Sequence, residues 1–204
     1  MGKVLENTYE KEYWSNDQYV MGIDEAGRGP LCGPLVVACC ILPINYQNDE
    51  INDSKQLSEK KRNELFKTII KDAHYFSFKI VSPKEIDELN IYGATKKAMD
   101  ELSKSSNLHS VTLTDAMPLN RYDVIDMVKG DAKSISIAAA SILAKVLRDH
   151  IMEGYNVLLP QYEYNKHKGY PTKRHLELLD EYGLNYLYRM SYKPCKDRVQ
   201  IKLF

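Results

Sequence analysis

The sequence predicts an α/β layer fold, in which helices surround a central mixed sheet, because strand-like and helix-like segments alternate along its 204 residues. Short apolar or alternating runs indicate strands, and longer runs with apolar residues three and four positions apart indicate helices. The expected strands are residues 18–23, 35–42, 74–81, 111–114 and 124–128, and the expected helices begin at residues 58, 82, 134 and 171.

Capping signals mark the ends of several expected helices. Ser58 is a typical N-cap ahead of apolar residues at helical spacing. Ser82 begins a capping box that Glu85 completes, so a long helix should follow, with an interruption near residues 90–93. Gly183 is placed to end the last helix.

The segment 134–152 is rich in Ala, Ile and Leu and predicts the longest helix. Its aliphatic face should lie on the sheet, and its alanines should allow a close approach. A neighbouring face carries Ser141 and Lys145. Two interpretations stay open for that face: contact with a backbone phosphate, or core packing with a lysine that extends to solvent.

Composition excludes several classes of protein. No window reaches the roughly 18 consecutive apolar residues of a membrane span. The polar first residues are unlike a secretory signal. None of the four cysteines forms a CxxC pair, so we expect reduced, mostly buried thiols in a cytoplasmic protein. A monomer is the default expectation.

The net charge is zero, and local charge is more informative. Residues 164–176 include Lys166, Lys168, Lys173 and Arg174 with interleaved tyrosines and no acidic residue. Such a segment could follow a nucleic-acid backbone. The alternative interpretation is a solvated basic surface.

Acidic residues stand at the ends of three apolar segments. Asp24 and Glu25 close the first expected strand, Asp115 ends another, and Asp131 precedes the long helix. Ligands of α/β sheets bind at strand ends, so these carboxylates could meet there. Because neighbouring residues of a strand point to opposite faces, Asp24 and Glu25 share one site only if the backbone leaves the regular pleat. The glycines at positions 27 and 29 would allow that.

Clustered carboxylates repel one another unless a cation lies between them. Hard divalent ions with oxygen ligands, Mg²⁺ or Mn²⁺, suit such a cluster, and phosphodiester hydrolysis is the chemistry that it would support. The alternative is that each acid merely ends a strand or starts a turn. The glycine-rich run fits neither the dinucleotide fingerprint nor a P-loop, because its spacing is wrong and no GK[ST] follows.

Several blocks of the sequence together resemble the ribonuclease HII family. They occur in the family's order and span residues 19–195 approximately. The blocks are residues 22–38 (GIDEAGRGPLCGPLVVA), 53–58 (DSKQLS), 114–116 (TDA), 129–131 (KGD), 136–149 (SIAAASILAKVLRD), 167–173 (HKGYPTK) and 189–194 (RMSYKP).

The resemblance implies a ribonuclease H-like fold with a five-stranded mixed sheet and a small C-terminal helical part. We expect a catalytic domain at residues 1–160 and a substrate-contacting part with a tail at residues 161–204, or one domain overall. The implied activity is endonucleolytic cleavage of RNA in RNA–DNA hybrids and at ribonucleotides embedded in duplex DNA. The products would carry 3′-hydroxyl and 5′-phosphate ends, and the roles would be ribonucleotide and RNA primer removal.

The resemblance also implies roles for particular residues. The metal site would consist of Asp24, Glu25, Asp115 and Asp131. The backbone around the 27–29 motif would recognise the ribose 2′-hydroxyl, the one group that distinguishes RNA from DNA at a nucleotide, and Tyr170 would recognise the RNA–DNA junction. The implied or expected substrate contacts are Gly27, Arg28, Gly29, Tyr170, Lys55, Ser141, Lys145 and Lys168.

Three rival functions fit the sequence less well than ribonuclease HII. Ribonuclease HIII would bring a long N-terminal domain and a Gly-Lys-Gly motif. A non-enzymatic hybrid-binding module would be expected to lose a carboxylate, and an integrase would order its acids differently.

The last five residues, Gln200 to Phe204, are similar to the peptide by which bacterial repair proteins dock on the sliding clamp. The alternatives are a short edge strand through Val199, Ile201 and Leu203, or a chance match.

Overall fold

A computed structural model describes residue 5 and residues 7–201, apart from the side chains of residues 8, 200 and 201. Its centre is a five-stranded mixed sheet in the order β3-β2-β1-β4-β5. The β2 strand pairs antiparallel with both β1 and β3, whereas β4 pairs parallel with both β1 and β5. The predicted fold class is therefore confirmed. The strands are β1 (Tyr19–Ala26), β2 (Leu35–Ile41), β3 (Tyr75–Val81), β4 (His109–Asp115) and β5 (Val124–Met127).

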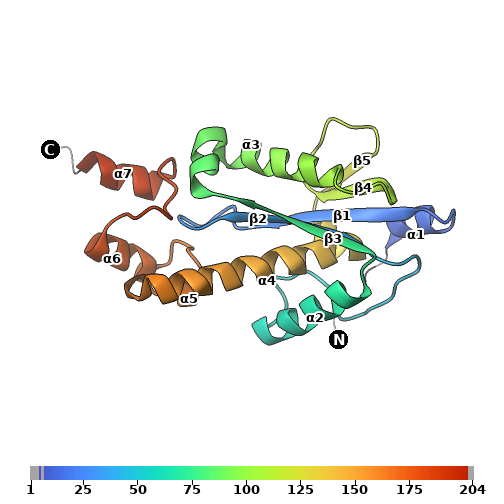
Figure 1. Cartoon of the computed structure of the whole chain (residues 1–204), viewed down its shortest axis with the longest axis horizontal. Helices are drawn as coiled ribbons and strands as arrows, with labels where there is room; N and C mark the ends of the chain where they lie inside the picture. The colour runs from blue at the N-terminus through green and yellow to red at the C-terminus, as the bar shows by residue number, and fades with distance from the viewer. Residues whose placement is uncertain (1–4, 6, 202–204) are drawn as a thin grey trace.

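Helices cover both faces of the sheet (Figure 1). The long helix α4 lies against β1 and β2 with α2 beside it, and α3 covers the opposite face. The helices are α1 (Thr8–Trp14), α2 (Glu59–Asp72), α3 (Pro83–Ser103), α4 (Ile135–Leu158), α5 (Tyr164–His167), α6 (Lys173–Tyr182) and α7 (Lys193–Ile201), with short 3₁₀ turns η1 (Gly130–Ala132) and η2 (Pro160–Tyr162). None of the helices in the described part of the chain is both long and apolar enough to cross a membrane.

The α4 helix approaches the sheet closely at Gly22 of β1. A Cβ atom there would lie 2.1 Å from the carbonyl carbon of Ser136 in α4, so only glycine fits. The expected close approach of the alanine-rich helix therefore depends on both partners. Asp24 lies two residues further along β1 on the same face, and is consequently directed toward α4.

The predicted caps are present. The Ser58 hydroxyl accepts from the N–H of Lys61, and Ser82 and Glu85 form the reciprocal capping box. The expected interruption of α3 occurs at Asn90, whose φ of 55° and ψ of 165° are not helical. Its side-chain oxygen accepts from the N–H of Gly93 and restarts the helix. Local capping chemistry thus sets both ends of these segments.

The C-terminal helices share a core with the earlier part of the chain. Leu31 and Cys32 of the connection after β1, and Met152 of α4, belong to the same buried cluster as Leu179 and Tyr188. The division expected at residue 160 stays a prediction. All four cysteines are buried free thiols, as expected, and burial raises the pKa of Cys32 to about 12.

Three helices were not expected from the sequence. They are α1, α5 and α7, which are short and mostly polar, so none of them gives a strong periodic signal. The α7 helix includes Val199 and runs to Ile201, so the alternative of an edge strand there is wrong. Residues 202–204 of the sequence-predicted docking peptide lie outside the described residues.

Candidate metal centre and substrate site

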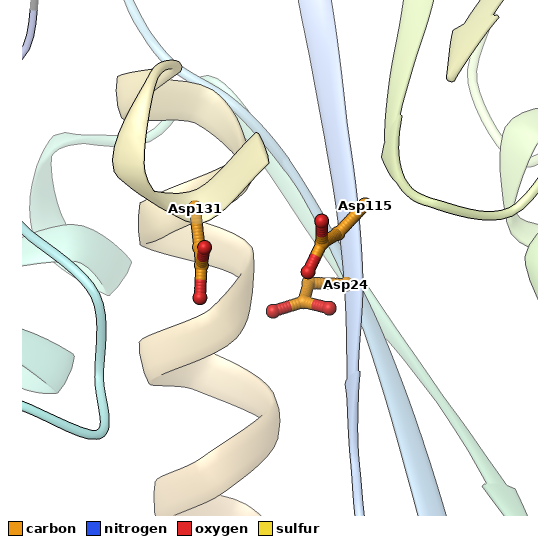
Figure 2. Close-up of side chains that lie close together, drawn as sticks. All are labelled: Asp24, Asp115 and Asp131. Carbon is orange, nitrogen blue, oxygen red and sulfur yellow. The ribbon is translucent and has the colours of Figure 1, made fainter. Parts of the chain in front are cut away.

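Three aspartates meet at one edge of the sheet. Asp24 lies near the end of β1 and Asp115 ends the parallel neighbour β4, in a register that pairs Ile23 with Thr114. Asp131 approaches from η1, just before α4. One oxygen from each carboxylate lies within 4.8 Å of the other two, and the three side chains point toward one another (Figure 2). The ends of β1 and β4 and the turn before α4 therefore bring three of the four predicted carboxylates together.

Burial and mutual repulsion make this cluster costly while it is charged. The pKa of Asp24 is raised well above its usual value, chiefly by burial and then by the charges of Glu25 and Asp115. Burial also raises the pKa of Asp131, although Lys55 opposes that effect from 3.4 Å. A divalent cation among the three carboxylates would offset both the repulsion between them and the unfavourable burial of their charge.

The Asp24 carboxylate is oriented by its neighbours. Its Oδ1 accepts from the backbone N–H of Glu25 at 2.8 Å. The Ser141 hydroxyl also hydrogen-bonds to Asp24, and the Oγ atoms of Ser141 and Ser54 are 2.9 Å apart. The Ser141 side chain, for which contact with a phosphate was one of two interpretations, thus contacts a proposed metal ligand.

Glu25 stands apart from the three aspartates. The pairing of β1 with β2 stays regular through Ala26, so the expected departure from the pleat at this point is wrong, and residues 24 and 25 begin on opposite faces. The Glu25 carboxylate lies 3.5 Å from the Arg28 guanidinium. Burial raises its pKa, Arg28 opposes this, and the charge of Asp115 adds to it.

One oxygen of Glu25 has no partner among the described residues. Its Oε2 is buried and makes no hydrogen bond there. A buried carboxylate oxygen without a partner, near three clustered aspartates, fits the oxygen-only donor set that Mg²⁺ or Mn²⁺ prefers. The residues present therefore suit a divalent cation.

Lys55 is the basic residue nearest the cluster. Burial alone would lower its pKa, but Asp131, Asp24 and Asp53 together raise it. Its side chain remains 75% exposed, so the ammonium group is accessible from solvent. The structure thus places this predicted substrate contact at the rim of the acidic site.

The glycine motif, residues 27–29, lies beside Tyr170. Gly27 has a φ of +105°, which favours glycine. A Cβ atom on Gly29 would lie 3.7 Å from the Tyr170 ring, and that ring is 40% exposed. Segments 140 residues apart in the sequence therefore form one accessible surface.

The basic run is not a uniformly solvated surface. His167 and His175 are buried, and their rings stack with centroids 4.0 Å apart. Lys166 and Arg174 both pair with Glu163, and Lys168 pairs with Glu153.

On α4, Lys145 donates to Asp149 at 2.7 Å. Lys145 is therefore a half-buried, ion-paired lysine, and its contact with a phosphate stays a prediction.

Comparisons with known proteins agree with this geometry. Residues 21–195 match the family model described as "Ribonuclease HII". The chain belongs to the ribonuclease HII family. It is 46% identical to the ribonuclease HII of Ligilactobacillus salivarius over 190 residues, which cover 92% of this chain and 74% of that protein.

Solved structures show the same fold. The ribonuclease H2 of Pyrococcus horikoshii is 28% identical with a TM-score of 0.77, over 90% of this chain and 98% of that one. The ribonuclease HII of Archaeoglobus fulgidus, solved in complex with PCNA, is also 28% identical with a TM-score of 0.71, over 86% and 95% of the two chains. Ribonuclease HII is an endoribonuclease of the H type, so membership implies cleavage of RNA paired with DNA. The H-type ribonucleases depend on divalent metal, in line with the aspartate cluster.

Sequence reasoning missed the buried basic residues of this ribonuclease HII chain. Arg148 and Arg189 are fully buried and donate mainly to backbone carbonyls of residues 28–34 and 168. Both arginines lie inside blocks that carried the family resemblance, yet they were not singled out. The signal that could have found Arg148 is its position on the otherwise apolar face of α4.

Proposed function

We propose that this chain hydrolyses the RNA strand of RNA–DNA hybrids and incises duplex DNA at embedded ribonucleotides. Asp24, Asp115 and Asp131 would hold divalent cations, Mg²⁺ or Mn²⁺, and Glu25 would complete the set. The observation that carries the proposal is the convergence of three carboxylates within 4.8 Å at the sheet edge. When bound, such ions activate water and stabilise the leaving oxygen, which gives 3′-hydroxyl and 5′-phosphate ends.

The chain's own residues prepare the site for a phosphodiester. Ser141 and the N–H of Glu25 orient the Asp24 carboxylate. The accessible ammonium of Lys55, 3.4 Å from Asp131, would lie beside the phosphate backbone and lessen its repulsion from the carboxylates. Lys145 and Lys168 would contact phosphate only after exchanging their acidic partners Asp149 and Glu153.

Recognition of the ribonucleotide is assigned to the surface formed by the glycine motif and Tyr170. Backbone without side chains at Gly27 and Gly29 can approach a ribose closely enough to hydrogen-bond its 2′-hydroxyl. The half-exposed Tyr170 ring next to Gly29 can stack on the neighbouring nucleotide. Their proximity supports one combined readout of sugar and junction.

A defined substrate tests the proposal. The experiment incubates a duplex with one embedded ribonucleotide, a continuous hybrid and an all-DNA duplex with Mg²⁺, Mn²⁺ or EDTA. We expect cuts in the first two substrates with either ion, none with EDTA and none in all-DNA duplex. The 5′-phosphate is verified by ligation of the product to an acceptor oligonucleotide. Cleavage in EDTA, or equal cleavage of all-DNA duplex, would refute it.

We also propose that residues 200–204 dock on a sliding clamp, which would bring the enzyme to ribonucleotide repair and primer removal. Support comes from the Archaeoglobus fulgidus relative, whose structure is a complex with PCNA. The peptide offers Gln200 as a polar anchor and two apolar anchors, Leu203 and Phe204.

The tail proposal is tested by deleting residues 200–204. Cleavage of short oligonucleotides should be unchanged while binding to the clamp is lost. Loss of folding or of cleavage in the truncated protein would make the tail structural and end the docking proposal.

A further inference from the structure

Arg148 of α4 joins the two segments that the proposed function assigns to ribonucleotide recognition. Its Nε donates to the carbonyl oxygen of Pro34 at 3.0 Å, and its Nη2 donates to that of Cys32 at 3.3 Å. Its Nη1 donates to the carbonyl of Lys168 at 2.9 Å, two residues before Tyr170. One guanidinium therefore bonds both the connection that follows the glycine motif and the segment that carries the tyrosine.

The same side chain touches both recognition elements directly. The Tyr170 ring centroid lies 5.8 Å from the Arg148 Cζ. A Cβ atom on Gly27 would lie only 2.2 Å from the Arg148 Nε, so the glycine backbone rests on this side chain. The glycine motif thus lies against one part of Arg148 and the tyrosine ring against another.

Arg148 is a buried cation without a carboxylate partner among the described ion pairs. Its exposed fraction is zero, and burial lowers its pKa to about 10. Burial of such a charge is unfavourable unless every donor is satisfied. Each of the three Arg148 nitrogens donates to a carbonyl here, and these carbonyls come from two separate segments. The favourable burial of Arg148 therefore depends on the relative position of the two segments.

The second buried arginine has a different reach. Arg189 donates to the carbonyls of Gly33 and Arg28, so it also holds the connection after β1. None of its described side-chain bonds goes to residues 168–170. A backbone bond from Leu31 to Gly169 also links the two segments, and Arg148 is the side-chain link that substitution can change.

We propose that Arg148 is a specificity-determining positioning residue that sets the gap between the glycine motif and the Tyr170 ring. The inference rests on the proposed role of that surface in ribonucleotide recognition. The described hydrogen bonds of Arg148 go to none of the proposed metal ligands, so its effect on cleavage should pass through Tyr170. Coupling between the two residues is therefore the property to measure.

The experiment is a double-mutant cycle of Arg148 and Tyr170 in the full chain. Arg148→Lys keeps the charge, but its single nitrogen cannot reach all three carbonyls. Arg148→Gln removes the charge, so no unpaired cation is buried. Because the two replacements disturb the site in different ways, at least one should fold. We expect each folded variant to cleave the single-ribonucleotide duplex at least 10-fold more slowly, with the Mn²⁺ midpoint unchanged within twofold. In a Tyr170→Ala background the same change should cost less than threefold.

A matched core variant separates positioning from instability. Leu143→Ala removes buried volume from the same helix, in a different buried cluster from Leu31 and Cys32. At a temperature where it and the Arg148 variants are folded, it should keep its rate within threefold. Wild-type rates in the Arg148 variants, equal losses in both backgrounds, or failure of both variants to fold would overturn the inference. If Tyr170→Ala itself cleaves normally, the proposed role of Tyr170 fails instead.

Discussion

The backbone N–H of Gly130 donates to Oδ1 of Asp115 at 2.9 Å, which ties the end of β4 to the turn that carries Asp131. A Cβ atom at position 130 would lie 2.6 Å from the Ile137 side chain and 3.0 Å from the Met127 side chain, so a larger residue there would displace both. Two of the three clustered aspartates are thus fixed relative to each other by one bond that requires no metal.

That bond makes Asp115→Asn a clean test of the metal site. The replacement amide keeps an oxygen that can accept from Gly130, so the fold should be retained while a negative ligand is lost. We expect Asp115→Asn and Asp24→Asn each to lower cleavage by about 10³-fold or more, because metal catalysis contributes several kcal/mol to the barrier. Hybrid affinity should fall by less than threefold, measured by fluorescence anisotropy.

Asp126→Asn is the matched control, since Asp126 is an exposed acid on the neighbouring strand β5. It should cleave like the unmodified enzyme. Substantial turnover by Asp24→Asn or Asp115→Asn in Mn²⁺ would remove that residue from the site.

Tyr170 gives a second prediction. Tyr170→Ala should slow cleavage at one embedded ribonucleotide by about 10-fold or more, because stacking on a base contributes roughly 1–3 kcal/mol. Affinity for plain duplex DNA should change by less than about threefold, since phosphate neutralisation dominates non-specific binding. Tyr186→Ala, at another exposed tyrosine of the C-terminal part, is the control. Equal losses of cleavage and of duplex affinity would make Tyr170 a structural residue.

The carboxylate positions were predictable because strand ends of parallel neighbours share one edge. Asp24 and Asp115 follow from that rule, and Asp131 from its place before α4. The behaviour of Glu25 was not predictable, because only the register with β2 shows that the pleat stays regular through Ala26. A local pattern identifies which residues are acidic, whereas strand pairing decides which face each one occupies.

The second part of the site could not be predicted for a related reason. A run of basic residues is normally a surface signal, yet His167 and His175 form a buried stack and Arg148 is fully enclosed. Most of their partners are backbone groups, which leave no trace in the amino-acid pattern. Tertiary hydrogen bonding therefore determines the character of this region.

The histidine stack leads to a third prediction. The Nδ1 of His175 faces the carbonyl of Tyr170 at 2.8 Å, and only an N–H can bond there. The other nitrogen, Nε2, lies 2.9 Å from the Tyr188 hydroxyl and accepts from it when the ring is neutral. Burial first, and then repulsion from His167, lower the pKa of His175 to about 4.

Stability should therefore fall as the pH is lowered. The unfolded chain takes up a proton near the ordinary histidine pKa of about 6.5, whereas folded His175 resists it until about pH 4. The stabilisation is complete above pH 6.5 and is lost between 6.5 and 4, by about 2 kcal/mol at pH 5. Urea unfolding at pH 7.5 and 5 measures it. His175→Asn should reduce this pH dependence, while exposed His150→Gln should not; an unchanged pH dependence in His175→Asn would contradict the assignment.

The last prediction concerns α1, which precedes the residues that match the family model. Buried Glu10 accepts from the N–H of Ser136 at 3.1 Å and from the Ser134 hydroxyl, and Asn7 accepts from the N–H of Ile135 at 2.9 Å. These groups satisfy the first donors of α4, directly after the turn that carries Asp131. The N-terminal helix thus supports the start of the helix on which the metal centre depends.

Glu10→Ala should therefore lower the free energy of unfolding by about 2 kcal/mol, since it leaves a buried N–H and a hydroxyl without their acceptor. A small displacement of Asp131 should also raise the Mg²⁺ concentration needed for half-maximal cleavage by about 10-fold, the usual scale for groups that orient metal ligands indirectly. Glu12→Ala, on the exposed side of the same helix, should change neither quantity. A loss of stability in Glu10→Ala with an unchanged Mg²⁺ requirement would confine α1 to the fold and separate it from the metal centre.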